Sequence, residues 1–224
     1  MTTPSNTSAR APGDRLREAA LLSSSAVLVE FASSSKRGER VDLALFRALN
    51  RGHGDRADAF FGGLTELGSI TSPSVASGVL ALRGHRGTAL RGAGAAGTTW
   101  LVDQALKKLY LRARPYDRLP DVVRLLIGRP PATSWPSSHP SVLIAFLTVA
   151  GEELGLTRAE RLALDAIAGL VAVSRVYLGV HYPSDVVAGL LLGRAVGQAW
   201  LAAGGRAGAP ATDADDGFAA PPGR

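Results

Sequence analysis

The residues best suited to chemistry lie in one short stretch, Ser174-Arg-Val-Tyr-Leu-Gly-Val-His-Tyr-Pro-Ser-Asp185. Pro183 suits the first turn of a helix, so we expect a helix to begin there, with Asp185 in that turn. From this position the carboxylate can accept a hydrogen bond from one ring nitrogen of His181, which leaves the other ring nitrogen free to attack. Arg175 adds a permanently charged fork suited to phosphate oxygens. An isolated histidine is usually structural, but this combination predicts a phosphoryl-transfer centre.

Two further stretches supply groups that bind anions. Lys107 and Arg114 are seven residues apart, so we expect them on one face of a helix, where both cations can address the same anion. The sequence Trp-Pro-Ser-Ser-His-Pro at 135–140 places a proline where a helix can start. Its serines and free N–H groups predict an anion cradle next to a second histidine: Ser137, Ser138 and His139.

In chain order the three stretches read Lys…ArgPro, ProSer…His and SerArg…His…Asp, and they resemble the signature of the type 2 phosphatidic acid phosphatase (PAP2) superfamily. The resemblance covers residues 107–185. One position departs from the pattern, because Ser138 stands where the second motif usually has glycine. Serine keeps the N–H and adds a hydroxyl, but it narrows the room for close backbone approach. The resemblance implies an all-α fold, a six-helix transmembrane bundle of the PAP2/haloperoxidase type.

The resemblance also implies a role for each residue. His181 would be the nucleophile that forms a phosphohistidine, with Asp185 fixing its tautomer, and His139 would protonate the leaving alcohol and then activate water. No metal or other cofactor is expected, since no histidine and carboxylate cluster has metal-ligand spacing. The phosphoryl group would be held by cations and the serine cradle: Lys107, Arg114, Ser137, Ser138 and Arg175.

Length and composition are consistent with a single basic domain. The 224 residues carry a formal net charge of +6 and no cysteine, which removes disulfides and thiolate chemistry. The positive charge suits nucleic acid, an anionic membrane or an anionic substrate, but the arginines are dispersed and aromatic residues are few, so nucleic-acid binding is not expected. We expect disordered tails at 1–14 and 205–224 around a phosphatase domain at 15–204.

Six apolar runs favour an integral membrane protein, although none is an uninterrupted apolar span of about 20 residues. Small residues at four-residue spacing, in Gly92–Gly97 and at Gly189 and Gly193, favour close helix contacts. The segment Gly92–Gly97 also matches a dinucleotide-binding pattern. That pattern requires a preceding strand, and no strand is expected before residue 92. A soluble helical bundle is the alternative, because the family resembled includes soluble acid phosphatases. The runs are 19–31, 67–82, 92–106, 141–151, 162–180 and 186–203.

The first run, 19–31, has two further interpretations. Arginines precede it, as in a secretory signal, but Glu30 and the lack of a clear cleavage site count against this. It can also lie at the membrane interface instead of spanning. If all six runs span, the loops at 36–61, 107–139 and 175–182 share one face of the membrane, opposite both termini. The resemblance implies cytoplasmic termini and an active site on the extracytoplasmic face of the cell membrane.

The substrate is expected to be a lipid phosphate held at the bilayer. The resemblance favours a polyprenyl diphosphate, as for an undecaprenyl diphosphatase, with phosphatidate next. The apolar segment 122–127 would either guide a lipid chain to the site or pack as an ordinary loop. Two alternative hypotheses about the function remain. One is a vanadate-dependent haloperoxidase with His181 as the vanadate ligand, and the other is a non-enzymatic protein that binds lipid headgroups. The oligomeric state is left open.

Overall fold

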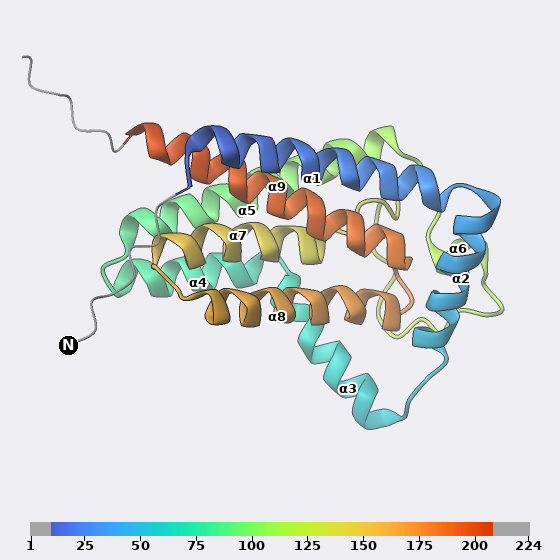
Figure 1. The fold of residues 1–224 in the computed structure, drawn as a ribbon. Coiled ribbons are helices and arrows are strands. Elements are labelled where there is room, and N and C mark those ends of the chain that lie inside the picture. Colours follow the sequence, from blue (N-terminus) through green and yellow to red (C-terminus); the bar gives the residue numbers. More distant parts are fainter. Residues whose placement is uncertain (1–9, 208–224) are drawn as a thin grey trace, which may run out of the picture.

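The computed structural model describes residues 10–207, and this part of the chain is a set of helices joined by loops (Figure 1). No β-strand occurs between residues 10 and 207, so the all-α prediction is confirmed. The elements are α1 (Pro12–Ser33), α2 (Lys36–Asn50), α3 (Asp55–Leu64), the 3-10 helix η1 (Thr65–Gly68), α4 (Thr71–Leu82), α5 (Arg86–Leu109), α6 (Pro115–Arg118), α7 (Ser138–Glu153), α8 (Arg158–Tyr177) and α9 (Pro183–Ala207).

Each of the six apolar runs lies mainly in its own helix, in α1, α4, α5, α7, α8 and α9, with the second run starting in η1. α7 is the central helix and packs against α5, α8 and α9, while α1 runs antiparallel to α9 along its outer side (Figure 1). Most α7 side chains between Pro140 and Gly151 are buried. The remaining helices, α2, α3 and α6, lie in the connections at one end of the bundle (Figure 1).

Small residues let the central helices approach closely. A Cβ atom added at Gly92 would collide with the ring of Phe146, and one added at Gly193 would collide with the carbonyl oxygen of Ser141. Within the α5 segment 92–97, Gly92 therefore serves helix packing, as the sequence indicated, and so does Gly94, which faces the ring of Trp200, whereas a Cβ at Gly97 would meet no atom within 4 Å. Gly189 also serves helix packing, because a Cβ there would meet the backbone of the chain entering α7.

Helical residues extend into both segments that the sequence predicts to be disordered. α1 begins at Pro12, inside the segment expected to be disordered, because proline is well suited to the first position of a helix. α9 continues to Ala207, past the expected boundary at 204. The rest of both predicted tails, 1–9 and 208–224, lies outside the described residues. The first turn of α1 and the last turn of α9 lie at the same end of the bundle (Figure 1).

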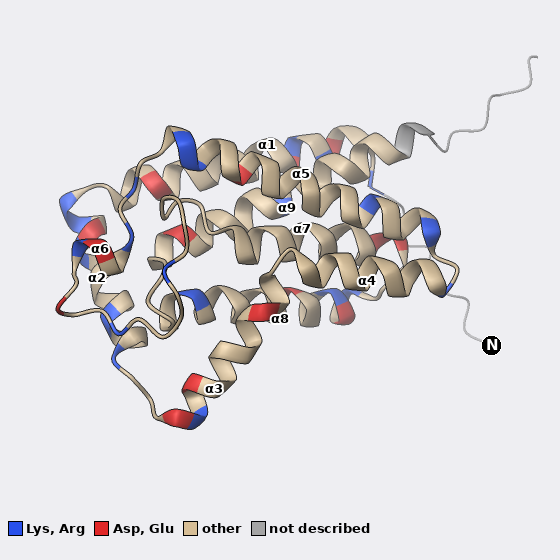
Figure 2. Cartoon of the chain, turned by 180° about the vertical axis from the view of Figure 1, so that it is seen from behind, with Lys and Arg blue, Asp and Glu red and all other residues tan. Residues whose placement is uncertain are grey.

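Within the described residues, one helical segment, Pro183–Gly204, is both long and apolar enough to cross a membrane, and 56% of its most apolar window is buried inside the bundle. Other helices expose large apolar side chains, including Leu28 and Phe31 of α1, Leu82 of α4 and Leu90 of α5. Charged residues gather mainly toward the two ends of the bundle (Figure 2). The middle of the helical bundle therefore carries few charged residues, and several of its helices expose large apolar side chains.

Candidate active site

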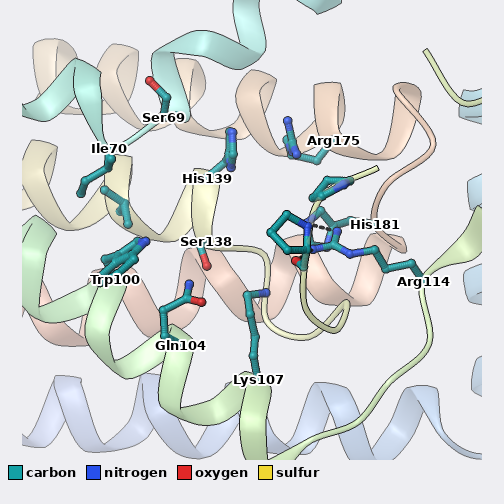
Figure 3. A pocket seen from close by; sticks show the side chains of 14 residues that line it. Ser69, Ile70, Trp100, Gln104, Lys107, Arg114, Ser138, His139, Arg175 and His181 are labelled. Atoms are coloured by element: carbon teal, nitrogen blue, oxygen red, sulfur yellow. Dashed lines mark hydrogen bonds between the residues drawn. The ribbon is translucent and has the colours of Figure 1, made fainter. Parts of the chain in front are cut away.

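A cavity of about 390 Å³ is lined by residues of η1, α5, α7, α8 and the loops that precede α7 and α9. These loops lie at the end of the bundle opposite the first turn of α1 (Figure 1). Side chains from α5, α7, α8 and the connecting loops point into the cavity (Figure 3). Apolar groups of Ile70, Trp100 and Val142 line one part of its wall. Six of the eight residues singled out from the sequence also line it: Lys107, Arg114, Ser138, His139, Arg175 and His181.

His181 is a buried, neutral imidazole whose proton position can be inferred. Nη1 of Arg114 lies 3.1 Å from Nε2 of His181, and a guanidinium can only donate, so Nε2 accepts and the ring proton is on Nδ1. Burial first, and then the positive charges of Arg114, Lys107 and Arg175, lower the pKa of His181 well below its usual value. Nε2 therefore carries an unprotonated lone pair at neutral pH, and this lone pair accepts the hydrogen bond from Arg114.

Asp185 lies in the first turn of α9, as predicted, but its carboxylate is engaged differently. Oδ2 accepts a hydrogen bond of 2.8 Å from the backbone N–H of Tyr182 and another from the hydroxyl of Ser134. Oδ1 accepts one of 2.7 Å from Nη1 of Arg112. Nδ1 of His181 is 3.6 Å from Oδ2, too far for a hydrogen bond. The expected histidine–carboxylate hydrogen bond is thus not formed, and the neutral imidazole and the carboxylate are only close neighbours.

Lys107 and Arg114 reach the same cavity, but the prediction that they share a helical face is wrong. α5 ends at Leu109, and Arg114 has extended backbone angles, φ −73° and ψ 158°. The cause is Pro115, which disfavours a helical conformation in the residue before it. The loop after α5 instead turns back and brings the guanidinium of Arg114 to the cavity.

Backbone carbonyls hold both cations in place. Nζ of Lys107 donates to the carbonyl of Pro136. Arg114 donates to the carbonyls of Ala132 and Val180, at 3.0 Å and 2.8 Å. Because both side chains are buried and anchored by neutral groups, their positive charge is available to an anion in the cavity.

The serine motif differs from expectation at its first residue. α7 begins at Ser138, two residues later than Pro136, because Ser137 is extended and its N–H donates to the backbone oxygen of Asp185 at 3.1 Å. Ser137 is completely buried and does not line the cavity, so its N–H is not free for the predicted cradle. Ser138 and His139 occupy the first turn of α7, where backbone N–H groups point out of the helix. The backbone N–H groups left for the predicted cradle therefore begin at Ser138.

Arg175 has a partner that the sequence did not reveal. Its Nη1 donates to the hydroxyl of Thr65 at 2.7 Å, and both residues are buried. Thr65 lies in η1, far from every motif in the sequence, and no spacing pattern marks it. Sequence reasoning also missed Arg112 and Ser134, which lie within or between the motif stretches at positions that carry no motif residue.

The apolar segment 122–127 packs as a loop instead of lining the cavity. The side chain of Asn50 holds its backbone at Arg124 through two hydrogen bonds of 2.8 Å. The Arg124 side chain is paired with Asp58 of α3. The loop reaches the cavity only at its later residues, Pro130 and Pro131.

Taken together, the site offers three buried cations, a helix start and two imidazoles around one cavity (Figure 3). This combination suits a tetrahedral oxyanion with a nucleophile on one side. Between residues 10 and 207, no group of three or more His, Cys, Asp or Glu side chains is arranged to hold a metal ion. Fold and site define a helical protein built for phosphoryl-group chemistry.

The family model of the PAP2 superfamily matches residues 89–208. The chain therefore belongs to the PAP2 superfamily, as the three motifs indicated. It is similar to decaprenylphosphoryl-5-phosphoribose phosphatase of Mycobacterium tuberculosis, with 34% identity over 45% of this chain and 52% of that protein. The chain thus spans about half the length of this relative. The protein of the same name from Mycolicibacterium smegmatis is 31% identical over 70% of this chain and 84% of its own length.

Two solved structures share the fold. The crystal structure of Aquifex aeolicus LpxE has a TM-score of 0.64 and 28% identity, and the match covers 71% of this chain and 93% of that one. The structure of a transmembrane PAP2-type phosphatidylglycerolphosphate phosphatase from Bacillus subtilis has a TM-score of 0.65, over 85% of this chain and 96% of that one. At 23% identity the second likeness concerns the fold alone.

Proposed function

We propose that this protein is a membrane lipid phosphatase that hydrolyses a lipid phosphomonoester or diphosphate through a phosphohistidine intermediate, without a metal ion. The observation that carries the proposal is the position of Nε2 of His181. His181 lines one cavity together with Lys107, Arg114 and Arg175, and its Nε2 accepts a hydrogen bond from Arg114. A neutral nucleophile among fixed cations is what attack on a phosphate anion requires.

In the first step the cations bind the non-bridging oxygens of the phosphoryl group and neutralise their charge. Nε2 of His181 attacks phosphorus, so that an N–P bond forms as the P–O bond to the lipid breaks. The leaving oxygen takes a proton from His139 in its protonated form. The imidazole of His181 becomes positively charged, and the carboxylate of Asp185, 3.6 Å from Nδ1, stabilises that charge.

In the second step His139, now neutral, accepts a proton from a water molecule, which attacks phosphorus. The N–P bond breaks, His181 regains its neutral form, and inorganic phosphate leaves. Both steps use the same cations, because the charge to be stabilised lies on the same three oxygens.

The apolar middle of the bundle supports a location in the cell membrane with several spans. α1, α5, α8 and α9 contain 22, 24, 20 and 25 residues. At about 1.5 Å per residue each covers about 30 Å or more, the thickness of the hydrocarbon core. The exposed leucines of α1, α5 and α8, together with Phe31 of α1, suit lipid contact. We place the catalytic end on the extracytoplasmic face and the first turn of α1 with the last turn of α9 on the cytoplasmic face.

The substrate we favour carries a prenyl chain, either as a polyprenyl diphosphate or as another prenyl-linked phosphate. The names of the mycobacterial relatives, which describe phosphatases of a decaprenyl-linked phosphoribose, support this class. Ile70, Trp100 and Val142 give the cavity an apolar wall next to the phosphate-binding groups, which suits a lipid chain close to the reacting phosphate. Phosphatidate is the second choice.

A matched panel of substrates tests the proposal. The purified protein in detergent is given undecaprenyl diphosphate, a decaprenyl-linked sugar phosphate, phosphatidate, phosphatidylglycerol phosphate and glucose-6-phosphate, and phosphate release is compared as kcat/KM. We expect the prenyl compounds to lead. A preference for phosphatidate would change only the choice among lipids, whereas a preference for glucose-6-phosphate would overturn the lipid assignment.

A further inference from the structure

Arg112 joins three buried carboxylates from three different helices. Its guanidinium lies 3.1 Å from Oε2 of Glu30 in α1, 2.8 Å from Oδ2 of Asp42 in α2 and 2.7 Å from Oδ1 of Asp185 in α9. The side chains of the three acids are 7%, 6% and 0% exposed. Arg112 falls between Lys107 and Arg114 in the sequence, but it does not line the cavity.

The same cluster fixes the start of α9. Oδ1 of Asp42 accepts a hydrogen bond of 2.8 Å from the backbone N–H of Ser184, and the Ser184 hydroxyl donates to Oδ2. The guanidinium of Arg112 lies 4.5 Å from the centre of the Tyr182 ring. Arg112 contacts Tyr182 and Asp42 binds Ser184, so together they hold the segment between His181 and Asp185, although neither touches His181 itself.

We propose that Arg112 is a positioning residue for the reaction and acts through Asp185. Its contact with Oδ1, together with the Tyr182 N–H on Oδ2, sets where the carboxylate lies relative to Nδ1 of His181. When the imidazole gains charge on attack, the carboxylate is already 3.6 Å away and needs little movement to stabilise it. A misplaced carboxylate would leave the phosphohistidine, and the transition state leading to it, less stable.

The proposal also gives α1 and α2 an indirect role in the reaction, through Arg112. Glu30 and Asp42 orient the two ends of the Arg112 fork, and both precede residues 89–208, the part matched by the family model. A guanidinium can serve several carboxylates at once because its donors point in fixed, separate directions, whereas the ammonium of lysine is a single point charge. The proposal therefore predicts that lysine cannot replace Arg112, even though the charge is kept.

The test compares Arg112→Lys with Arg91→Lys in the purified full-length protein. Arg91 also pairs with a carboxylate, Glu153, but at the opposite end of the bundle. We expect Arg112→Lys to lower kcat by about tenfold or more with KM changed less than about threefold, since the phosphate-binding groups are untouched. Inhibition by vanadate should stay as in the wild type, which shows that the cavity is intact. Arg91→Lys should retain wild-type kcat.

A double-mutant cycle then separates positioning from general support of the fold. Arg112→Lys is combined with Asp185→Asn, and turnover is followed with an activated aryl phosphate to keep slow variants measurable. If Arg112 acts through Asp185, its replacement should cost less than about threefold in kcat once Asp185 is changed. Independent, multiplying effects would overturn the proposal, as would wild-type kcat in Arg112→Lys.

The inference rests on the proposed phosphatase function, and the two can fail separately. If the wild-type protein releases no phosphate from any lipid or aryl phosphate, the function itself is wrong. If the wild-type protein is active and Arg112→Lys is equally active, only the role of Arg112 is wrong.

Discussion

Nη1 of Arg114 donates to Nε2 of His181 across 3.1 Å, so the cation covers the very lone pair that we expect to attack phosphorus. A bound phosphoryl group must therefore take over this donor as Nε2 turns to the phosphorus atom. Arg114 would serve both states, first fixing the tautomer of the histidine and then neutralising a phosphate oxygen. The role of Arg114 thus depends on the geometry of its guanidinium N–H donors as well as on its charge.

For Arg114→Lys we expect kcat/KM to fall by about 100-fold, because a lysine cannot keep its carbonyl contacts and still reach a phosphate oxygen. Steady-state kinetics on the best lipid substrate would measure this. Arg129→Lys, at an exposed position whose side chain is 68% accessible, is the matched control and should behave as the wild type. Equal kinetics for both variants would contradict the role of Arg114.

Replacing the two histidines should separate the two steps of the reaction. His181→Ala removes the nucleophile and should abolish turnover. His139→Ala should slow it by about 100-fold or more, since it removes general acid and base catalysis. With an activated aryl phosphate, whose leaving group needs no proton, the His139→Ala protein should accumulate phosphohistidine, detectable by acid-labile 32P labelling. Full activity of His181→Ala would disprove the mechanism.

The environment of His181 predicts that acid weakens the fold. Its pKa in the folded protein lies well below the usual value, through burial and nearby cations, while the unfolded chain binds a proton near pH 6.5. As pH falls below about 6.5 the unfolded state gains protons that folded His181 does not, so stability decreases. Thermal unfolding in detergent at neutral and mildly acidic pH would show this. The decrease should be smaller in His181→Gln, and an unchanged pH dependence in that variant would refute the argument.

Activity should persist in EDTA, because in the proposed mechanism side-chain cations and N–H groups alone bind the phosphoryl group. Vanadate, which resembles phosphate in the transition state, should inhibit competitively, and Arg175→Lys should weaken this inhibition by about tenfold or more. Phosphate release with and without chelator measures the first effect. Activity lost in EDTA and restored by magnesium would contradict a metal-independent site.

The arrangement of the helices predicts labelling from opposite sides of a membrane. The chain has no cysteine, so single cysteines can be placed at Arg118, at the catalytic end, and at Arg158, where α8 begins. Both positions are exposed. In intact cells an impermeant maleimide should label Arg118→Cys, and it should label Arg158→Cys only after the membrane is opened. Labelling of both positions in intact cells would reject the proposed topology.

The sequence alone was enough to locate the six apolar helices and to name six of the residues that line the cavity. Proline at position 183, an aspartate two residues later and the following apolar run dictated the start of α9, because these preferences are local. The six apolar runs likewise marked six helices, since burial along a helix follows its composition. Residue type also identified the cations and histidines, because few side chains can bind phosphate or attack it.

Only the tertiary structure decided how these groups meet. Arg114 reaches the cavity through the loop between α5 and α6, which ends at Pro115, and Ser137 turns away from the cavity to bind the backbone of α9. Asp185 is held by Arg112, a partner 73 residues away that no local pattern marks. Hydrogen bonds between distant segments depend on how the helices pack, and helix packing is fixed by the fit of many side chains at once. For that reason the sequence could name the reacting groups, whereas the residues that orient them emerged only from the fold.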